Sequence, residues 1–391
     1  MRAPYTEMQT DRQSPSVDTL PLSDRPTAAV IDLNALDHNF KEAVTRVDGQ
    51  KILAVVKAGA YGHGAVEISR RLLTLGADML GVALVEEGRE LRASGIDAPI
   101  LVMGALFPEQ AEAAVALRLM PVVFDRAQAQ ALSRAARNKG TTIKVHVKID
   151  TGMGRIGIAP ESAVDFIAEL KSLAGIEVQG LMTHFADADL QNKQFASFQM
   201  DRFEALLKAL DARGIVIPVR HAANSAAVID LRRALFTMVR PGLMLYGYNP
   251  LEVGMHGAGL QPVLSLATRI AFLKNVPPGV PLSYGRTFVT QRDSIIATLP
   301  IGYADGYSRA LSNRGEALVR GRRVPVAGRV CMDMCMIDVT DVPDVRVGDA
   351  VVLIGSQGNE RITADDIAAK TGTIAYEVLC GISSRVPRIY Q

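Results

Sequence analysis

The feature that most constrains the fold is an alternation of short apolar runs with segments of helical periodicity. Stretches such as 62–75, 126–139 and 160–173 repeat their apolar residues at helical spacing. Eight apolar runs alternate with such segments, at 51–57, 79–84, 99–103, 120–124, 143–149, 177–184, 217–221 and 236–246. Eight strand–helix units predict an α/β fold with an N-terminal (β/α)8 barrel, which typically takes about 250 residues.

Beyond residue 255 the sequence changes in texture, because Pro, Gly, Val and Thr become more frequent. Turn residues separate short apolar runs at 265–275, 294–301, 317–326, 335–339 and 350–354. Short helices are expected at 362–370 and 375–382. We therefore predict a barrel domain over 27–255, followed by a mostly β C-terminal domain over 256–391.

The N-terminal segment carries a different pattern. Residues 1–26 mix charges with four prolines and hold no apolar core, so we predict a disordered N-terminal extension and no signal peptide. The run Val30–Asp32 is a ninth apolar run that does not fit the barrel count. One place for it is the sheet of the second domain.

Composition excludes several classes of partner. The chain has 43 Lys and Arg against 41 Asp and Glu, and this balance of +2 provides no field for nucleic acid or an anionic membrane. No stretch is long and apolar enough to span a bilayer. The three cysteines form no CxxC pair, which fits a reducing compartment. We expect a cytoplasmic protein.

Polar side chains gather at the ends of the predicted strands, where barrel enzymes place their active sites. They are Lys57, Lys148, His184, His221 and Arg240. An amine held at the dry mouth of a barrel loses its charge easily, which suits Lys57 to Schiff-base chemistry. The alternative for Lys57 alone is a solvated lysine at a strand end.

A phosphate site is indicated on the same rim. Asn224-Ser225 and Arg240-Pro-Gly-Leu243 offer backbone N–H groups and a hydroxyl after the seventh and eighth strands, where barrels hold phosphate groups. Pyridoxal 5'-phosphate needs both an amine and a phosphate cradle.

Two other sites were weighed against this one. Residues 152–157 match GxGxxG, but the acid at the right distance, Glu177, lies at the start of its strand, which disfavours dinucleotide binding. Lys148, His184 and His221 could be ligands of a barrel metallohydrolase. That fold needs metal ligands where this chain has the cations Lys57 and Arg240, so we expect no metal.

The whole set of motifs resembles bacterial alanine racemase, a fold-type III pyridoxal-phosphate enzyme. The resemblance runs from about residue 26 to 391. It rests on AVVKAGAYGHG, KIDTGMGRIG, MTHFADAD, HAANSAA, VRPGLMLYG, SYGRTF, GYADGY, GRVCMD and YEVLCGISSRVPRIY, in that order.

The resemblance implies an isomerase that interconverts L-alanine and D-alanine with pyridoxal 5'-phosphate, supplying D-alanine for peptidoglycan. Racemisation needs bases on both faces of the substrate. Lys57 corresponds to the base that also binds the cofactor and serves the D face, and Tyr284 to the base for the L face. In the family this tyrosine comes from the partner subunit, which implies a homodimer.

The resemblance also assigns binding roles. Arg155 and Met332 correspond to contacts of the substrate carboxylate, and Lys148 to a lysine that is carbamylated in many members. The alternative for Lys148 is pairing with Asp150. The implied cofactor contacts are Lys57, Tyr61, Arg155, His184, Ser225, Arg240, Gly242, Leu243 and Tyr376. The chain departs from the family pattern at Gly59 and Met334.

Two rival functions stay open. One is racemisation of another amino acid, such as serine or lysine, on the same scaffold. The other is a non-catalytic pyridoxal-phosphate carrier, a class whose barrels lack a β domain with a tyrosine base.

Overall fold

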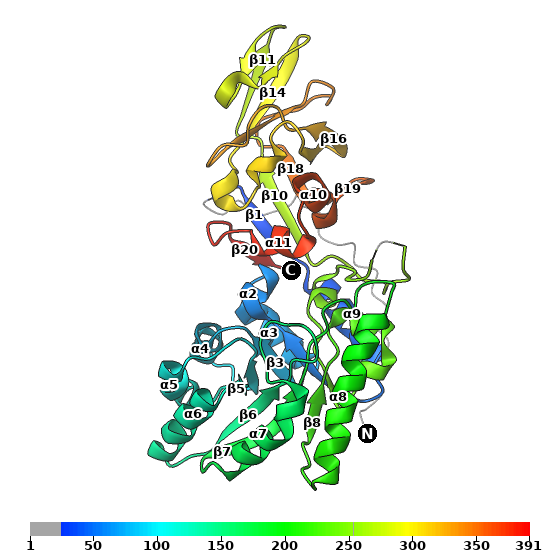
Figure 1. The fold of residues 1–391 in the computed structure, drawn as a ribbon. Helices are drawn as coiled ribbons and strands as arrows, with labels where there is room; N and C mark the ends of the chain where they lie inside the picture. The colour runs from blue at the N-terminus through cyan, green and yellow to red at the C-terminus, as the bar shows by residue number, and fades with distance from the viewer. Residues whose placement is uncertain (1–24, 253) are drawn as a thin grey trace. The chain divides into compact units, whose positions relative to one another are not determined.

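The computed structural model describes residues 25–252 and 254–391. Within them the chain forms two compact units, visible in Figure 1. One unit comprises Leu33–Val263, and the other combines Leu264–Gln391 with the described residues up to Asp32. The expected disordered extension lies outside the described residues, apart from Arg25 and Pro26. No helix in the described part is long and apolar enough to cross a bilayer.

The first unit is built on an eight-stranded parallel sheet that closes almost completely into a barrel, with strand order β8-β7-β6-β5-β4-β3-β2-β9. Each predicted run contains one strand, so the barrel prediction is confirmed. The strands are β2 (Lys51–Val55), β3 (Met79–Val82), β4 (Ile100–Val102), β5 (Met120–Val123), β6 (Ile143–Lys148), β7 (Ile176–Met182), β8 (Val219–His221) and β9 (Met238–Val239).

Helices flank these strands in Figure 1 and cover their outer side. Local signals set several helix starts. Asp125 caps α6 by accepting hydrogen bonds from the Ala127 and Gln128 N–H groups, and Pro160 opens α7. The helices are α1 (Leu33–Thr45), α2 (Lys57–Tyr61), α3 (Ala65–Thr74), α4 (Val85–Ala93), α5 (Ala111–Ala116), α6 (Arg126–Asn138), α7 (Pro160–Ser172), α8 (Gln194–Ala212) and α9 (Ser225–Asp230).

The second unit is mostly β, as predicted. Its main sheet has the order β16-β15-β18-β10-β1-β20 with β19 added beside β18, and β11-β14-β17 and β12-β13 form two smaller sheets. The strands are β1 (Ala28–Ile31), β10 (Leu264–Arg269), β11 (Phe272–Val276), β12 (Pro281–Leu282), β13 (Phe288–Val289), β14 (Ser294–Leu299), β15 (Glu316–Val319), β16 (Arg322–Pro325), β17 (Cys335–Asp338), β18 (Ala350–Gln357), β19 (Glu360–Ile362) and β20 (Arg388–Tyr390).

The ninth apolar run belongs to this second unit. Strand β1 pairs antiparallel with β10 and parallel with β20, so residues 28–31 lie in the sheet of the β-rich unit. The units therefore do not divide at 26/27 and 255/256, where the sequence placed the boundaries. The boundaries in the structure differ from the predicted ones because strand pairing assigns residues to a unit, and composition does not reveal strand pairing.

Two predicted runs each span a pair of strands: 265–275 spans β10 and β11, and 317–326 spans β15 and β16. The run 317–326 is a hairpin of β15 and β16, because Arg320 and Gly321 both have positive φ and form a tight turn between them.

The helices α10 (Ala364–Thr371) and α11 (Ala375–Cys380) were expected from the sequence. At the start of α10, Thr363 and Asp366 form a capping box.

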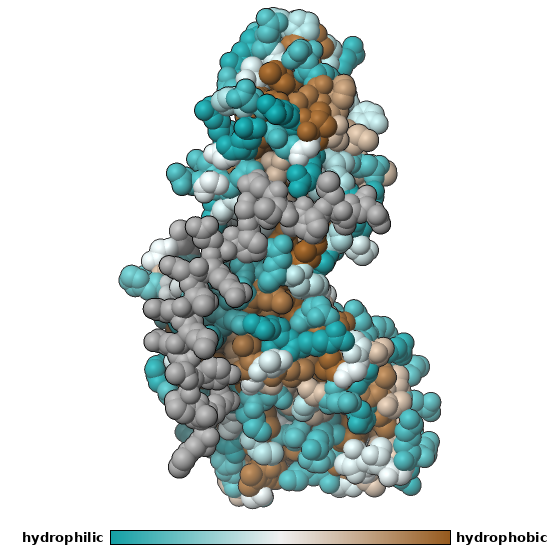
Figure 2. Space-filling model, turned by 180° about the vertical axis from the view of Figure 1, so that it is seen from behind, coloured by the Kyte–Doolittle hydropathy of each residue, from teal (hydrophilic) through white to brown (hydrophobic). Residues whose placement is uncertain are grey.

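Hydrophobic surface is distributed over both units. The face shown in Figure 2 carries apolar patches on each unit. Large exposed apolar side chains include Phe195 and Phe198 in the barrel unit, and Phe272, Met332 and Met334 in the β-rich unit.

A buried carboxylate organises the loops of the β-rich unit. Asp305 is fully buried, pairs with Arg25 at 2.7 Å and Arg385 at 3.4 Å, and accepts a hydrogen bond from the Gly302 N–H. Burial by itself would raise the pKa of Asp305, but Arg25, the Gly302 N–H and Arg385 outweigh it and hold the pKa below its usual value. The carboxylate is therefore charged at neutral pH and stabilises the turn at residues 303–305.

That turn fixes the segment that carries Met332. The Tyr303 N–H donates to the Cys331 carbonyl and the Ala304 N–H to the Met332 carbonyl, both at 3.0 Å. A side chain at Gly302 would lie 2.3 Å from both carbonyl oxygens, so only glycine permits this approach.

We predict that Asp305→Asn destabilises the β-rich unit by about 2–3 kcal/mol, because it leaves buried polar groups without a counter-charge. The matched control is Asp341→Asn, which removes an exposed pair with Arg292 and should cost less than about 0.5 kcal/mol. Thermal unfolding at neutral pH measures both. Since the Asp305 pKa is lowered in the folded protein, the difference between wild type and Asp305→Asn should shrink as the pH falls through that pKa. Equal midpoint shifts for the two variants would contradict the prediction.

Candidate active site

Lys57 leaves the end of β2 through an unusual backbone turn. Ala58, Gly59, Ala60 and Tyr61 all have positive φ, between 53° and 61°, so the short α2 segment is left-handed. This conformation costs about 1–2 kcal/mol for each residue other than glycine. Gly59 adopts it without a steric penalty, which explains why glycine is tolerated at this departure from the family pattern.

Tyr61 is buried against Tyr246. Its ring stacks on Tyr246, with ring centroids 4.7 Å apart, and the Tyr246 hydroxyl donates to the Val55 carbonyl at 2.8 Å. A Cβ at Gly242 would lie only 2.6 Å from the Tyr61 hydroxyl oxygen. Gly242 thus lets that hydroxyl approach the backbone after β9.

Ser225 faces the same backbone. Its Oγ accepts hydrogen bonds from the Gly242 N–H at 2.8 Å and the Met244 N–H at 3.3 Å, and Leu243 begins the adjoining 3-10 turn. The Tyr61 and Ser225 hydroxyls therefore converge on the backbone at residues 242–244, and hydroxyl groups are donors that a phosphate group binds. The structure brings together Tyr61, Ser225, Gly242 and Leu243.

Arg240 is 3% exposed, and both terminal nitrogens of its guanidinium donate hydrogen bonds. Its guanidinium donates to the Thr183 and Ala222 carbonyls at 2.8 and 2.9 Å, and to Nδ1 of His221 and of His184, each at 3.1 Å. Burial lowers the pKa of Arg240 to about 9, so it is a cation at neutral pH. The carbonyls and imidazoles fix its position.

This arrangement determines where the imidazole protons lie. A guanidinium only donates, so Nδ1 of His221 accepts and its proton lies on Nε2. That N–H then donates to Nδ1 of His146 at 2.8 Å. By the same reasoning the proton of His184 lies on Nε2. Arg240 is thus linked to a chain of neutral imidazoles.

The pKa values agree with neutral imidazoles. Burial is the largest cause that lowers the pKa of His184 and of His221 well below the usual value, and the Arg240 charge adds to it. For His146, burial lowers the pKa to about 4; the Gln179 side chain opposes this lowering, and Arg240 adds to it. All three are uncharged at neutral pH.

Lys148 is buried at the end of β6, among cations. Burial is the largest cause that lowers its pKa well below the usual value, with Arg240 and Arg155 adding and Asp150 opposing. Asp150 instead accepts hydrogen bonds from the Gly152 and Gly154 N–H groups. Among the described residues no ion pair joins Lys148 to Asp150.

The electrostatic field at His184 shows how these groups cluster. Its pKa is lowered, beyond the effect of burial, by Arg240, Lys148, Arg155 and Lys57, in that order. The predicted barrel residues therefore form one electropositive site, suited to an anionic ligand. No group of three metal-binding side chains occurs in the described ranges.

The other predicted residues lie in the β-rich unit. Tyr284 begins a short 3-10 turn and is 73% exposed, while Met332 and Tyr376 are also exposed. Ser283, which precedes Tyr284, has φ 64° and ψ 179°, a strained backbone conformation for a residue with a side chain. Its hydroxyl donates to the Arg329 carbonyl at 2.9 Å, which anchors the turn. The roles of Tyr284, Met332 and Tyr376 stay predictions.

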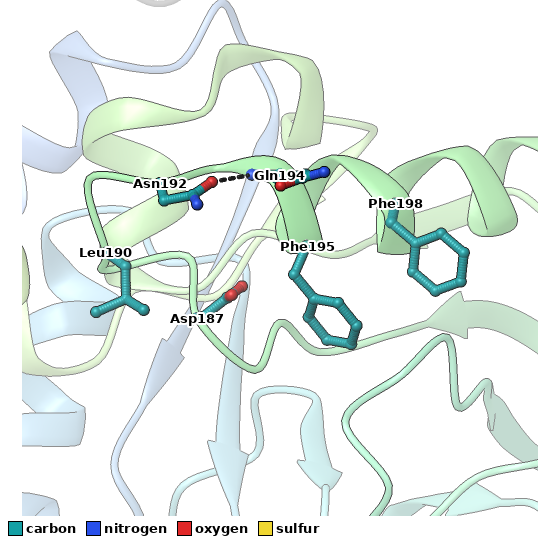
Figure 3. Close-up of a pocket in the computed structure, with 6 residues that line it drawn as sticks. All are labelled: Asp187, Leu190, Asn192, Gln194, Phe195 and Phe198. Carbon is teal, nitrogen blue, oxygen red and sulfur yellow. Dashed lines mark hydrogen bonds between the residues drawn. The ribbon is translucent and has the colours of Figure 1, made fainter.

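A separate pocket of about 480 Å³ lies on the barrel unit (Figure 3). Figure 3 shows the Phe195 and Phe198 side chains on α8, and the Asn192 side chain accepting a hydrogen bond from the Gln194 N–H. Phe195 also packs against Gly152, in the loop that leads to Arg155. None of the predicted site residues lines this pocket.

Two members of the site were missed in the sequence. His221 was placed at a strand end and interpreted only as a candidate metal ligand, and no role was predicted for His146. A signal for His146 existed, since it stands two residues before Lys148 in β6 and alternate residues of a strand share a face. The pairing of His146 with His221 depends on the barrel register and has no local signature.

Comparisons with known proteins agree with this geometry. Residues 31–250 match the family model "Alanine racemase, N-terminal domain", and residues 263–390 match "Alanine racemase, C-terminal domain". The alanine racemase of Halothermothrix orenii is 52% identical over 369 residues, which cover 94% of this chain and 97% of that protein.

Solved structures give the same result. The alanine racemase of Clostridium difficile 630 superposes with a TM-score of 0.90 at 40% identity, covering 94% of this chain and 96% of that one. The alanine racemase of Bacillus anthracis with bound L-Ala-P has a TM-score of 0.88 at 37% identity, covering 95% and 96% of the two chains. This chain belongs to the alanine racemase family.

Proposed function

We propose that this protein is a cytoplasmic, pyridoxal-phosphate-dependent isomerase that racemises alanine by a two-base route and supplies D-alanine for peptidoglycan. The observation that carries the proposal is the electropositive barrel mouth, in which Arg240 is held by neutral imidazoles near Lys57. Family membership over nearly the whole chain supports the same activity.

The barrel residues fit pyridoxal phosphate. Lys57 would bind its aldehyde, Arg155 its phenolate oxygen, and Arg240, with His184 beside it, would face its ring nitrogen. The phosphate would be held by Tyr61, Ser225, Gly242, Leu243 and Tyr376. The close approach of the Tyr61 hydroxyl to Gly242 supports this cradle. When bound, the cofactor withdraws electrons from the substrate Cα and so acidifies its α-proton.

Arg240 sets the electronic character of the site. It can only donate, and both imidazoles that contact it accept, so no proton is available for the ring nitrogen it faces. A pyridine ring with an unprotonated nitrogen would withdraw electron density less strongly from Cα. Return of a proton to Cα is then favoured over side reactions.

Two bases on opposite faces move the α-proton. The Lys57 amine takes or returns it on one face. The phenol of Tyr284 of the partner subunit serves the other, which makes the active unit a homodimer. The exposure of Tyr284 in the single chain, on a turn anchored through Ser283, supports this assignment.

Arg155 and Met332 would bind the substrate carboxylate. Lys148 supports Arg155 if it is carbamylated. Burial and nearby cations lower the pKa of Lys148 well below its usual value, which favours the neutral amine, the form that adds carbon dioxide. The resulting carbamate would be an anion among Arg240 and Arg155, where a cation is unfavourable.

The rival functions differ in substrate and in chemistry. Turnover of L-alanine, L-serine and L-lysine separates an alanine racemase from a racemase of larger amino acids. The C. difficile 630 alanine racemase, 39% identical with a TM-score of 0.88, has been solved in complex with cycloserine. A non-catalytic carrier would have no use for the β-rich unit that bears Tyr284.

We predict that Tyr284→Phe lowers L-to-D turnover by at least about 100-fold, because one of two bases is lost. The cofactor should stay bound, seen as a visible absorbance band that borohydride removes. In deuterated water, D-alanine should still exchange its α-proton through Lys57 without inverting. Tyr390→Phe makes the same change elsewhere in that unit and should have wild-type turnover. Wild-type L-to-D turnover in Tyr284→Phe would contradict the two-base route.

We predict that Gly242→Ala weakens pyridoxal phosphate binding by at least about tenfold, because the new Cβ displaces the Tyr61 hydroxyl. Gly259→Ala is the control, since a Cβ there meets nothing within 4 Å and φ is not in the left-handed region. Absorbance titration of the apoprotein with the cofactor measures both. Equal affinities would remove Gly242 from the phosphate cradle.

We predict that acid destabilises the barrel between pH 6.5 and 4. His146 has a folded pKa of about 4 against 6.5 unfolded, so in this window the unfolded chain binds the extra proton. Each such imidazole lowers the free energy of unfolding by up to about 1.4 kcal/mol per pH unit as the pH falls. His146→Gln should show a shallower pH slope of thermal stability, and exposed His256→Gln an unchanged one. A wild-type slope in His146→Gln would contradict a neutral His146.

A further inference from the structure

The left-handed turn after Lys57 is tied to the next strand by a side chain with no assigned role. Glu87 lies in the first turn of α4, which follows β3, and its side chain is half-buried. Figure 1 shows α2 and α4 as neighbouring segments of the barrel unit.

Glu87 binds three backbone N–H groups with its two carboxylate oxygens. Oε1 accepts from the Ala58 N–H at 2.6 Å, and Oε2 accepts from the Ala83 N–H at 2.6 Å and the Leu84 N–H at 3.1 Å. Hydrogen bonds to an ionised carboxylate are shorter and stronger than neutral ones. Two of the three lie at the end of β3, and the third lies directly after Lys57.

Ala58, whose N–H group Glu87 binds, is the first residue of this segment with a left-handed backbone conformation. Val56, before Lys57, has φ −120°, whereas Ala58 has φ 53° and ψ 48°. Main-chain bonds also join this region to the barrel, because the Val56 N–H donates to the Gly81 carbonyl and the Ala60 N–H to the Val56 carbonyl. Glu87 adds a charged anchor at the first left-handed residue.

From these contacts we infer that Glu87 is a positioning residue for Lys57 and Tyr61. Its carboxylate holds the left-handed turn in place against the end of β3, so the Lys57 amine and the Tyr61 hydroxyl face the barrel mouth. This role rests on the proposed function, in which Lys57 moves the proton and Tyr61 binds the phosphate. Glu87 itself touches no reacting atom.

The test compares three variants of the holoenzyme. Glu87→Ala removes both accepting oxygens, and Glu87→Gln keeps the shape and one of them. Glu86→Ala is the matched control, because it removes the same charge from the same turn of α4 and Glu86 makes only a 3.5 Å contact with Gln110.

Glu87→Ala should raise amide hydrogen exchange in residues 58–64 by at least about tenfold, while the rest of the barrel stays protected. Its kcat should fall by about 10- to 100-fold with a smaller change in KM, because the base is misplaced and the substrate carboxylate contacts remain. The borohydride-sensitive absorbance band should weaken or shift. Glu87→Gln should fall between wild type and Glu87→Ala, and Glu86→Ala should match wild type.

Wild-type exchange in residues 58–64 of Glu87→Ala, or faster exchange with unchanged kcat, overturns the inference. If Glu87→Ala does not fold, Glu87→Gln decides: wild-type exchange and kcat there also overturn it. Failure of the proposed function looks different. The wild-type protein would then show no borohydride-sensitive band and no alanine racemisation, whichever residue stands at position 87.

Discussion

The barrel site depends on one buried cation and the acceptors that surround it. Arg240 is buried, no carboxylate of the described residues pairs with it, and two carbonyls and two imidazole nitrogens stabilise it. A carboxylate would have neutralised the charge, whereas neutral acceptors hold it and leave the mouth electropositive. Burial is the largest cause that lowers the pKa values of His184, His221 and Lys148, and the Arg240 charge adds to it. Burial and one guanidinium thus act in the same direction on the pKa values of the neighbouring groups, and the resulting electropositive site suits an anionic ligand.

The residues proposed to contact the ligand are placed by backbone geometry as much as by side chains. The left-handed turn 58–61 directs Lys57 and Tyr61, and the strained Ser283 precedes Tyr284. Both segments have energetically unfavourable conformations that neighbouring groups stabilise, Glu87 in one case and the Arg329 carbonyl in the other. Strain concentrated beside proposed bases in both units is consistent with sites where position matters more than stability.

The sequence predicted the barrel well, because each apolar run is long enough to mark a strand and each strand end carries its own residues. Lys57, Lys148, His184 and Arg240 could be found by reading strand ends alone. The His146–His221 contact could not be found in this way, because it depends on the registers of β6 with β7 and of β7 with β8. The left-handed turn was also missed, because Ala58 and Ala60 give no signal for positive φ. The hairpin at 320–321 was read as one run because Arg320 does not look like a turn residue.

The pairing of β1 with both β10 and β20 has a consequence for synthesis. Strand β1, the first strand of the described residues, pairs with β10, which begins at residue 264, and with β20, at residues 388–390. Residues 33–263 can collapse while the remainder is still being translated, but residues 28–31 have no strand partner until more than two hundred further residues have been added. The second sheet therefore cannot be completed before β20 has been translated, and the contact of Arg25 with Asp305 likewise joins two segments far apart in the sequence.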